Sequence, residues 1–225
     1  MPAPSRGQLL EPCWQGMRFN LRPALVLQAF ALAIVFGYFW STHFRDALDV
    51  VGALKLRYGY AYSAIATSIF GGLIPYTVLA LAGRIPAQRR WAELAFYALL
   101  WFWKGMEVDA LYRAQAHWFG EGTSPGTIAI KTLVDQFGYA PLWAAPSQVL
   151  LFTWKDAGFS ISGARAAFQR QSFAQRVLVV VCSTWVVWIP AVAIVYSLPS
   201  ALQVPLFNLV LCFWCLLMSF ISRTS

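Results

Sequence analysis

The residues of this chain that could do chemistry are charged and amide side chains placed inside otherwise apolar segments. The stretch KTLVDQFGYAP holds Lys131, Asp135 and Gln136 close together. A lone charge at the centre of a membrane helix costs about 2.5–3.5 kcal/mol by insertion scales. Lys131 and Asp135 are four residues apart on one helical face, so we expect them to pair with each other or with charges of a neighbouring helix.

The same stretch contains two residues that loosen a helix, Gly138 and Pro141. We expect them to interrupt it, which a membrane tolerates where the freed backbone lines a cavity or is covered by protein. Two interpretations of the stretch stay open. Lys131, Asp135 and Gln136 line a polar path or site near the bilayer centre, or an internal salt bridge locks two helices together.

A second group of polar side chains lies in the apolar segment 91–113. Its charged members are Glu93, Lys104, Glu107, Asp109 and Arg113. Positions 93, 97, 100, 104 and 107 are three or four residues apart, so they share one helical face, which must point at protein or at a water-filled cavity. Lys104 with Glu107, and Asp109 with Arg113, have the spacing of helical ion pairs.

Two placements of these ion pairs stay open. The one we favour puts residues 104–113 at the outer membrane interface, in an aromatic belt with Trp101, Trp103 and Trp118. In the other, the side chains of Glu93, Lys104 and Glu107 continue the polar path.

Templates for catalysis and metal binding do not fit this chain. It contains no HExxH, no GxSxG and no glycine-rich phosphate loop with its lysine. Cys212 and Cys215 form a CxxC among Leu, Phe and Trp, which predicts two packed thiols, and no second Cys or His pair completes a zinc site. Asp46 and Asp49 form a lone DxxD, which predicts a solvated loop. We therefore expect no catalytic residue, metal or cofactor.

The composition is that of a membrane protein. Of 225 residues, 59% are hydrophobic and 12% are charged, whereas soluble domains carry about 25% charged residues. A soluble chain of this length buries only about 70% of the surface that its unfolded form exposes. The excess of 17 Lys and Arg over 9 Asp and Glu is interpreted as membrane topology, so the expected partner is the lipid bilayer and not nucleic acid.

The elements that position these residues are predicted to be six membrane helices in one domain, residues 1–225, with four helices as the alternative. About 20 apolar residues are needed per span. The candidates are 23–41, 62–83, 91–113, 127–153, 174–198 and 201–222. Loop residues on one side then carry eleven Lys and Arg against five on the other, which predicts that both termini are cytoplasmic.

Two longer connections separate the predicted spans. Residues 42–61 are expected to form a loop, and residues 154–173 to form either a solvated loop or an interfacial amphipathic helix. Gly71 and Gly72 in the second span suit close helix packing in lipid.

Residues 105–222 carry a recognisable order of side chains. Lys131 is followed by Asp135-Gln136, then Tyr139 and Ala140-Pro141. The C-terminal part of the pattern consists of Trp188, Pro190, Pro199 and Trp214. In both features the region resembles the Mpv-seventeen / peroxisomal-membrane-protein (PMP-twenty-two) family. It departs from that family where Ile189 separates Trp188 from Pro190, and where Gln203 replaces an expected Arg.

The resemblance implies an all-helical membrane protein without a cofactor or catalytic residues. It also implies a channel or conduit for ions or small metabolites, in a bacterial inner membrane or in a mitochondrial inner or peroxisomal membrane. The non-transporting alternative is a scaffold or assembly factor whose buried charges are structural. A third, weaker hypothesis is a membrane enzyme that acts on lipid through Asp46, Asp49 and Asp109. Homo-oligomers are compatible with each.

Overall fold

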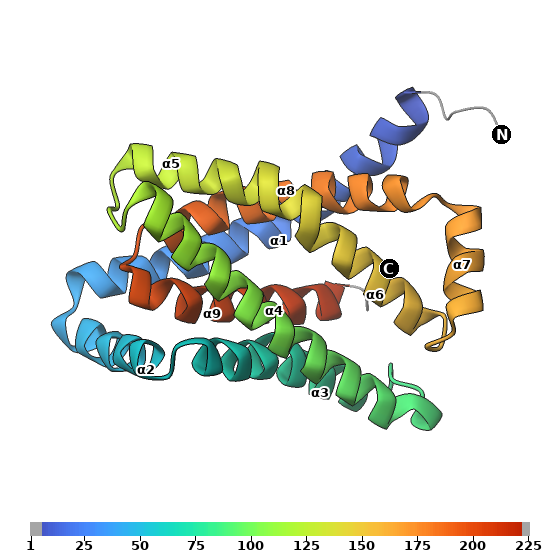
Figure 1. The fold of residues 1–225 in the computed structure, drawn as a ribbon, viewed down its shortest axis with the longest axis horizontal. Coiled ribbons are helices and arrows are strands. Elements are labelled where there is room, and N and C mark those ends of the chain that lie inside the picture. The colour runs from blue at the N-terminus through green and yellow to red at the C-terminus, as the bar shows by residue number, and fades with distance from the viewer. Residues whose placement is uncertain (1–5, 222–225) are drawn as a thin grey trace. The chain divides into compact units, whose positions relative to one another are not determined.

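The computed structural model describes residues 6–221, and it describes the side chains of residues 11–217. Within residues 6–221 the chain is helical and contains no strand, which confirms the all-α prediction (Figure 1). The elements are α1 (Arg6–Trp40), α2 (Thr42–Thr67), the π-helical turn η1 (Ser68–Leu73), α3 (Ile74–Leu81), the short 3-10 helix η2 (Ala87–Arg89), α4 (Arg90–Phe119), α5 (Pro125–Leu133), the π-helix η3 (Val134–Ala144), α6 (Ala145–Asp156), α7 (Ile161–Arg170), α8 (Phe173–Tyr196) and α9 (Ser200–Ile221).

Four helical stretches in the described part of the chain are long and apolar enough to cross a membrane. They are Glu11–Trp40, Thr42–Leu81, Phe173–Tyr196 and Ser200–Leu217. This is the architecture of an integral membrane protein. The other two predicted spans, residues 91–113 and 127–153, are also helical, but their charged side chains set them apart from the four apolar stretches.

The loop predicted for residues 42–61 is wrong, because these residues belong to helix α2. Ser41 caps the helix, with its hydroxyl accepting a hydrogen bond from the backbone N–H of Phe44 at 3.3 Å. Several charged side chains made this segment resemble a solvated loop. One of them, Lys55, is buried inside the fold, so its charge marks an interior contact and not exposure to water.

The expected interruption of the helix near Gly138 and Pro141 is also corrected. The chain stays helical through α5, η3 and α6, with the wider turns of a π-helix over Val134–Ala144. Proline has no backbone N–H and clashes with the carbonyl four residues earlier in a regular helix. The change of hydrogen-bond register in η3 accommodates it, as π-helical segments do within α-helices.

The connection between α6 and α8 contains the helix that was one of its two predicted forms. Helix α7 covers Ile161–Arg170, and the Ser160 side chain caps it by accepting a hydrogen bond from Gly163 N at 3.2 Å. Residues 163, 164, 167 and 168 are buried or half-buried, whereas Arg165 and Arg170 are exposed, which is typical of an amphipathic helix.

The chain divides into two compact units, one made of residues 1–25 and 132–190 and the other of residues 26–131 and 191–225. In the first unit, Asn20 Nδ2 donates a hydrogen bond to the Ser183 carbonyl oxygen at 2.7 Å. A Cβ atom on Gly16 would lie 2.7 Å from Ser183 Cβ. Helix α1 therefore meets α8 at a small residue.

In the second unit, α2 and η1 pack against α4, and α2 also packs against α9. Glycines make the close approach possible. A Cβ atom on Gly72 would lie 2.7 Å from the Tyr97 carbonyl oxygen, and one on Gly105 would clash with the Ser63 carbonyl oxygen. The prediction that Gly71 and Gly72 serve close helix packing is confirmed.

Candidate functional site: a buried ion-pair cluster beside a polar cavity

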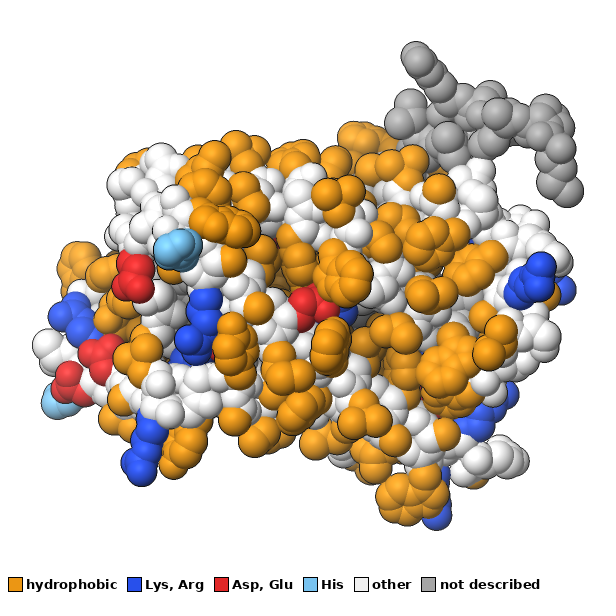
Figure 2. Space-filling view, in the orientation of Figure 1, with side chains coloured by type: hydrophobic (Ala, Val, Ile, Leu, Met, Phe, Trp, Pro, Cys, Tyr) orange, Lys and Arg blue, Asp and Glu red, His pale blue; other side chains and the backbone are white. Residues whose placement is uncertain are grey.

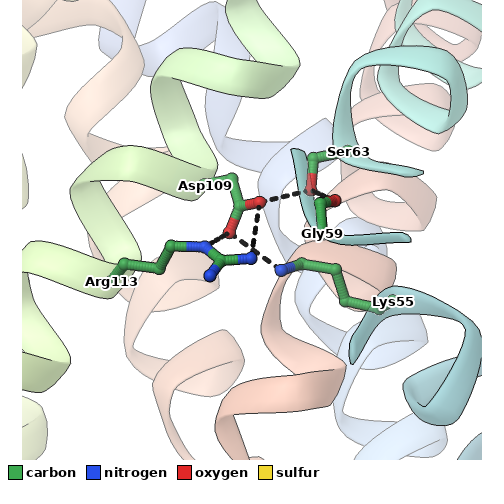
Figure 3. Close-up of polar contacts among 5 residues, drawn as sticks. All are labelled: Lys55, Gly59, Ser63, Asp109 and Arg113. Carbon is green, nitrogen blue, oxygen red and sulfur yellow. Dashed lines mark hydrogen bonds and ion pairs between the residues drawn. The ribbon is translucent and has the colours of Figure 1, made fainter. Parts of the chain in front are cut away.

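Asp109 of helix α4 is the centre of a cluster of charged side chains in the second unit (Figure 3). Its side chain is 2% exposed. Lys55 Nζ lies 2.9 Å from Asp109 Oδ1, and Ser63 Oγ donates a hydrogen bond to Oδ2 at 2.8 Å. An isolated buried carboxylate would be costly, so these donors are what make the position of Asp109 stable.

A kink in helix α2 brings Lys55 and Ser63 to the same carboxylate. Gly59 stands midway between them with φ +53° and ψ −125°, a conformation that favours glycine. The Ser63 hydroxyl is also 3.3 Å from the Gly59 carbonyl oxygen, but its single proton is better used on the closer Asp109. Figure 3 shows the lysine and the serine converging on Asp109 from either side of this glycine.

Arg113 lies one helical turn beyond Asp109 and binds the same carboxylate. Its Nε is 3.0 Å from Asp109 Oδ1, which confirms the predicted i,i+4 contact. The guanidinium carbon lies 4.7 Å from the centre of the Tyr60 ring, within the range of a cation–π contact. The Arg113 side chain is 48% exposed. Two cations and one carboxylate give the cluster a formal charge of +1.

The cluster opens onto a cavity of about 360 Å³. Helices α2, α4 and the start of α9 line it, together with Glu121 from the connection before α5. Its polar lining residues are Lys55, Asp109, Tyr112, Arg113, His117, Glu121, Ser200 and Gln203. Figure 2 shows hydrophobic side chains over most of the visible face, with acidic side chains mainly on its left side and basic side chains toward both its left and right edges. A cavity of this size and polarity can hold a small solute.

Lys131 lies in a second buried group of the same unit. Its Nζ is 5.9 Å from the centre of the Tyr196 ring, a cation–π distance. Gln115 Nε2 donates a hydrogen bond to the Tyr196 hydroxyl at 2.9 Å, and the ring of Tyr112 lies 5.1 Å from that of Tyr196. Tyr112 also lines the cavity, so one aromatic side chain touches both polar groups.

Asp135 and Gln136 lie in the first unit, on the π-helix η3. Gln136 Nε2 donates a hydrogen bond to Asp135 Oδ1 at 2.8 Å, and both side chains are buried. Trp185 Nε1 donates to the Gln136 carbonyl oxygen at 3.0 Å, which ties η3 to α8. An ion pair between Lys131 and Asp135 stays a prediction.

The polar face predicted for residues 91–113 lies on α4 and is buried in the protein. Lys104 Nζ lies 2.7 Å from Glu107 Oε1, which confirms the predicted i,i+3 contact. Glu93 is buried in the first turn of the helix, where a carboxylate is favoured by the helix dipole. Trp103 and Trp118 are exposed, but Trp101 is buried. Of the three tryptophans predicted to form an aromatic belt beside residues 104–113, Trp101 therefore lies in the interior of the protein.

The remaining residues of the family-like pattern are spread over several elements. Tyr139 and Pro141 lie in η3, Trp188 and Pro190 in α8, and Trp214 in α9. Pro199 precedes α9, and its carbonyl oxygen accepts a hydrogen bond from Leu202 N at 2.8 Å. Of these residues, Tyr139 and Pro141 lie in the same element as the predicted polar residues Asp135 and Gln136, namely η3.

Lys55 and Ser63 are the functional candidates that sequence reasoning missed. Lys55 was assigned to the loop 42–61, and Ser63 to the start of the predicted span 62–83. A signal was present, because Lys55, Gly59 and Ser63 recur every four residues and therefore share one helical face. A cation, a glycine and a hydroxyl aligned in this way indicate a buried polar contact.

No group of three His, Cys, Asp or Glu side chains in the described part of the chain is arranged to hold a metal ion. Asp49 accepts a hydrogen bond from the Tyr38 hydroxyl at 3.3 Å. The four cysteines are free thiols. Comparisons with protein-family models, curated proteins and solved structures find no match to this chain.

Proposed function

We propose that this protein is a membrane conduit for ions or small metabolites, with the cavity beside Asp109 as a polar site along the pathway. The observation that carries the proposal is the cavity of about 360 Å³ lined by charged side chains in an otherwise apolar helical unit. Ionisable groups at membrane depth face a water-filled cavity or a partner, and they mark solute pathways. The buried pairs Lys131–Tyr196 and Asp135–Gln136 are further polar positions for a solute.

The proposed topology has six spans, with α4 and the continuous α5–η3–α6 segment crossing the membrane beside the four apolar stretches. Both termini are then cytoplasmic, in agreement with the eleven-to-five distribution of Lys and Arg. In this topology the cavity faces the outer side, because Glu121 lies in an outward connection and Ser200 begins α9 directly after one. We also propose membership of the Mpv-seventeen / peroxisomal-membrane-protein family and a bacterial inner or an organelle membrane.

A scaffold or assembly factor is the second candidate, and one observation favours it. The most buried charges of α4 already have partners within the protein, namely Lys104 with Glu107 and Asp109 with Lys55. Buried ion pairs of this kind specify how helices pack without carrying any solute. In neither candidate does the protein act as an enzyme.

The experiment that separates these candidates is solute release from proteoliposomes that contain the purified full chain. A conduit releases trapped small ions faster than protein-free vesicles, and Asp109→Asn changes that rate because it alters the charge at the cavity. A scaffold gives vesicles as tight as the protein-free control, with the protein shown to be folded by circular dichroism. That second result would reject the conduit.

A further inference from the structure

The deep side of the cavity offers hydrogen-bond donors to a ligand. The Lys55 ammonium has three N–H groups, and among the described residues Asp109 is its one acceptor. Arg113 uses Nε and Nη2 on Asp109, so the guanidinium keeps other N–H groups for a ligand. Both side chains line the cavity. Lysine and arginine donors that converge in this way suit a carboxylate.

The rim of the cavity has the opposite character. Glu121 lines it and is exposed, and its Oε2 lies 3.4 Å from Ser200 Oγ. With His117 neutral, the charged lining residues are Lys55, Arg113, Asp109 and Glu121, so their formal charges cancel. A ligand that carries only a positive or only a negative charge would have the same sign of charge as one end of the cavity.

We propose that the cavity binds a small zwitterion, with its carboxylate at Lys55 and Arg113 and its ammonium at Glu121. This inference rests on the proposed conduit function and names its substrate class as amino-acid-like solutes. A carboxylate without an amine loses the contact with Glu121. An amine without a carboxylate has no group that can neutralise the charges of Lys55 and Arg113.

The test is calorimetric titration of the purified full chain in detergent at pH 7 with three matched probes, 4-aminobutyrate, butyrate and butylamine. We expect 4-aminobutyrate to bind more tightly than either single-charge probe. Because Arg113 and Glu121 are exposed to water in part, each contact is worth about 0.2–1 kcal/mol, so we expect an advantage of about 1.4-fold to fivefold over butyrate.

Two variants test the two ends of the cavity separately. Arg113→Gln should weaken 4-aminobutyrate and butyrate by similar factors, because both lose the same carboxylate contact. Glu121→Gln should weaken 4-aminobutyrate and leave butyrate unchanged or tighter. The matched controls are Arg57→Gln and Asp46→Asn, which remove exposed charges of the same types outside the cavity and should leave all three affinities unchanged.

Butyrate binding as tightly as 4-aminobutyrate, an unchanged preference in Glu121→Gln, or no binding of any probe would each overturn the zwitterion proposal. The release assay above reports on the conduit independently. Vesicles that leak ions while the protein ignores 4-aminobutyrate would reject the ligand class alone. Tight vesicles with selective binding of 4-aminobutyrate would reject the conduit and leave a zwitterion-binding membrane protein.

Discussion

Asp109 accepts contacts from Lys55, Arg113 and Ser63 while its side chain is 2% exposed. A buried carboxylate is stable only while such partners neutralise it, and breaking a buried pair typically costs about 3–5 kcal/mol. The two cations differ, since Lys55 is buried and Arg113 is half-exposed. Lys55 therefore depends on Asp109 for its position, whereas Arg113 can turn to water or to a ligand.

At the residue scale, we expect Asp109→Leu to lower the free energy of unfolding by about 3–5 kcal/mol, because it leaves the Lys55 ammonium buried without an acceptor. Adding Lys55→Met should recover most of the loss, since no unpaired buried charge then remains. Reversible unfolding in mixed detergent, followed by circular dichroism, measures both. Equal losses in the single and double variants would show that the pair does not hold these charges in place.

The elements show which features the sequence could predict and which it could not. All six predicted apolar segments are helical over most of their described residues, because hydrophobic length is a local property. The pairs Lys104–Glu107 and Asp109–Arg113 were also predictable, because helical spacing decides them. The contact of Lys55 with Asp109 joins residues 54 positions apart in the chain. It depends on the kink at Gly59 and on the packing of α2 against α4, which composition does not report.

At the element scale, the packing of α2 on α4 predicts that an alanine at Gly105 destabilises the protein. An alanine at Gly138, which lies on η3, is the comparison. Gly105→Ala should destabilise the protein by about 1–3 kcal/mol, because its Cβ would clash with the Ser63 backbone. Gly138→Ala should be neutral or stabilising by up to about 1 kcal/mol, since a Cβ there meets no atom within 4 Å.

The same unfolding assay compares these two variants under identical conditions. An unaffected Gly105→Ala would contradict the packing described for the second unit, and Gly138→Ala, on η3 of the first unit, is the control. Because Ser63 also donates to Asp109, Gly105→Ala should disturb the cavity as well as the helix contact.

For the whole molecule, six spans differ from four in that α4 and the α5–η3–α6 segment cross the membrane. The four apolar stretches alone would place the turn before α4 and the connection after it on the same side. With six spans these two connections lie on opposite sides. The charges on α4 from Glu93 to Arg113 are paired or buried within the protein, which is how a polar helix is tolerated in lipid.

We expect Ala87→Cys and Gly122→Cys, each made in a chain without its four native cysteines, to react with a membrane-impermeant thiol reagent from opposite sides. Both positions are exposed in connections. Ala87 should react only after the inner side is opened, whereas Gly122 should react in sealed spheroplasts or organelles. Reaction of both cysteines from one side would establish four spans. The cavity would then not have the outward-facing position proposed above.

The most direct test of the conduit is the reversal potential of the purified protein in planar bilayers under a salt gradient. A pathway that passes the cavity makes Arg113→Gln shift selectivity toward cations and Glu121→Gln shift it toward anions, because each removes one formal charge of opposite sign from the lining. We expect current in the wild type and shifts of the reversal potential in opposite directions in the two variants. Absence of current from folded protein, or identical reversal potentials in all three proteins, would contradict it.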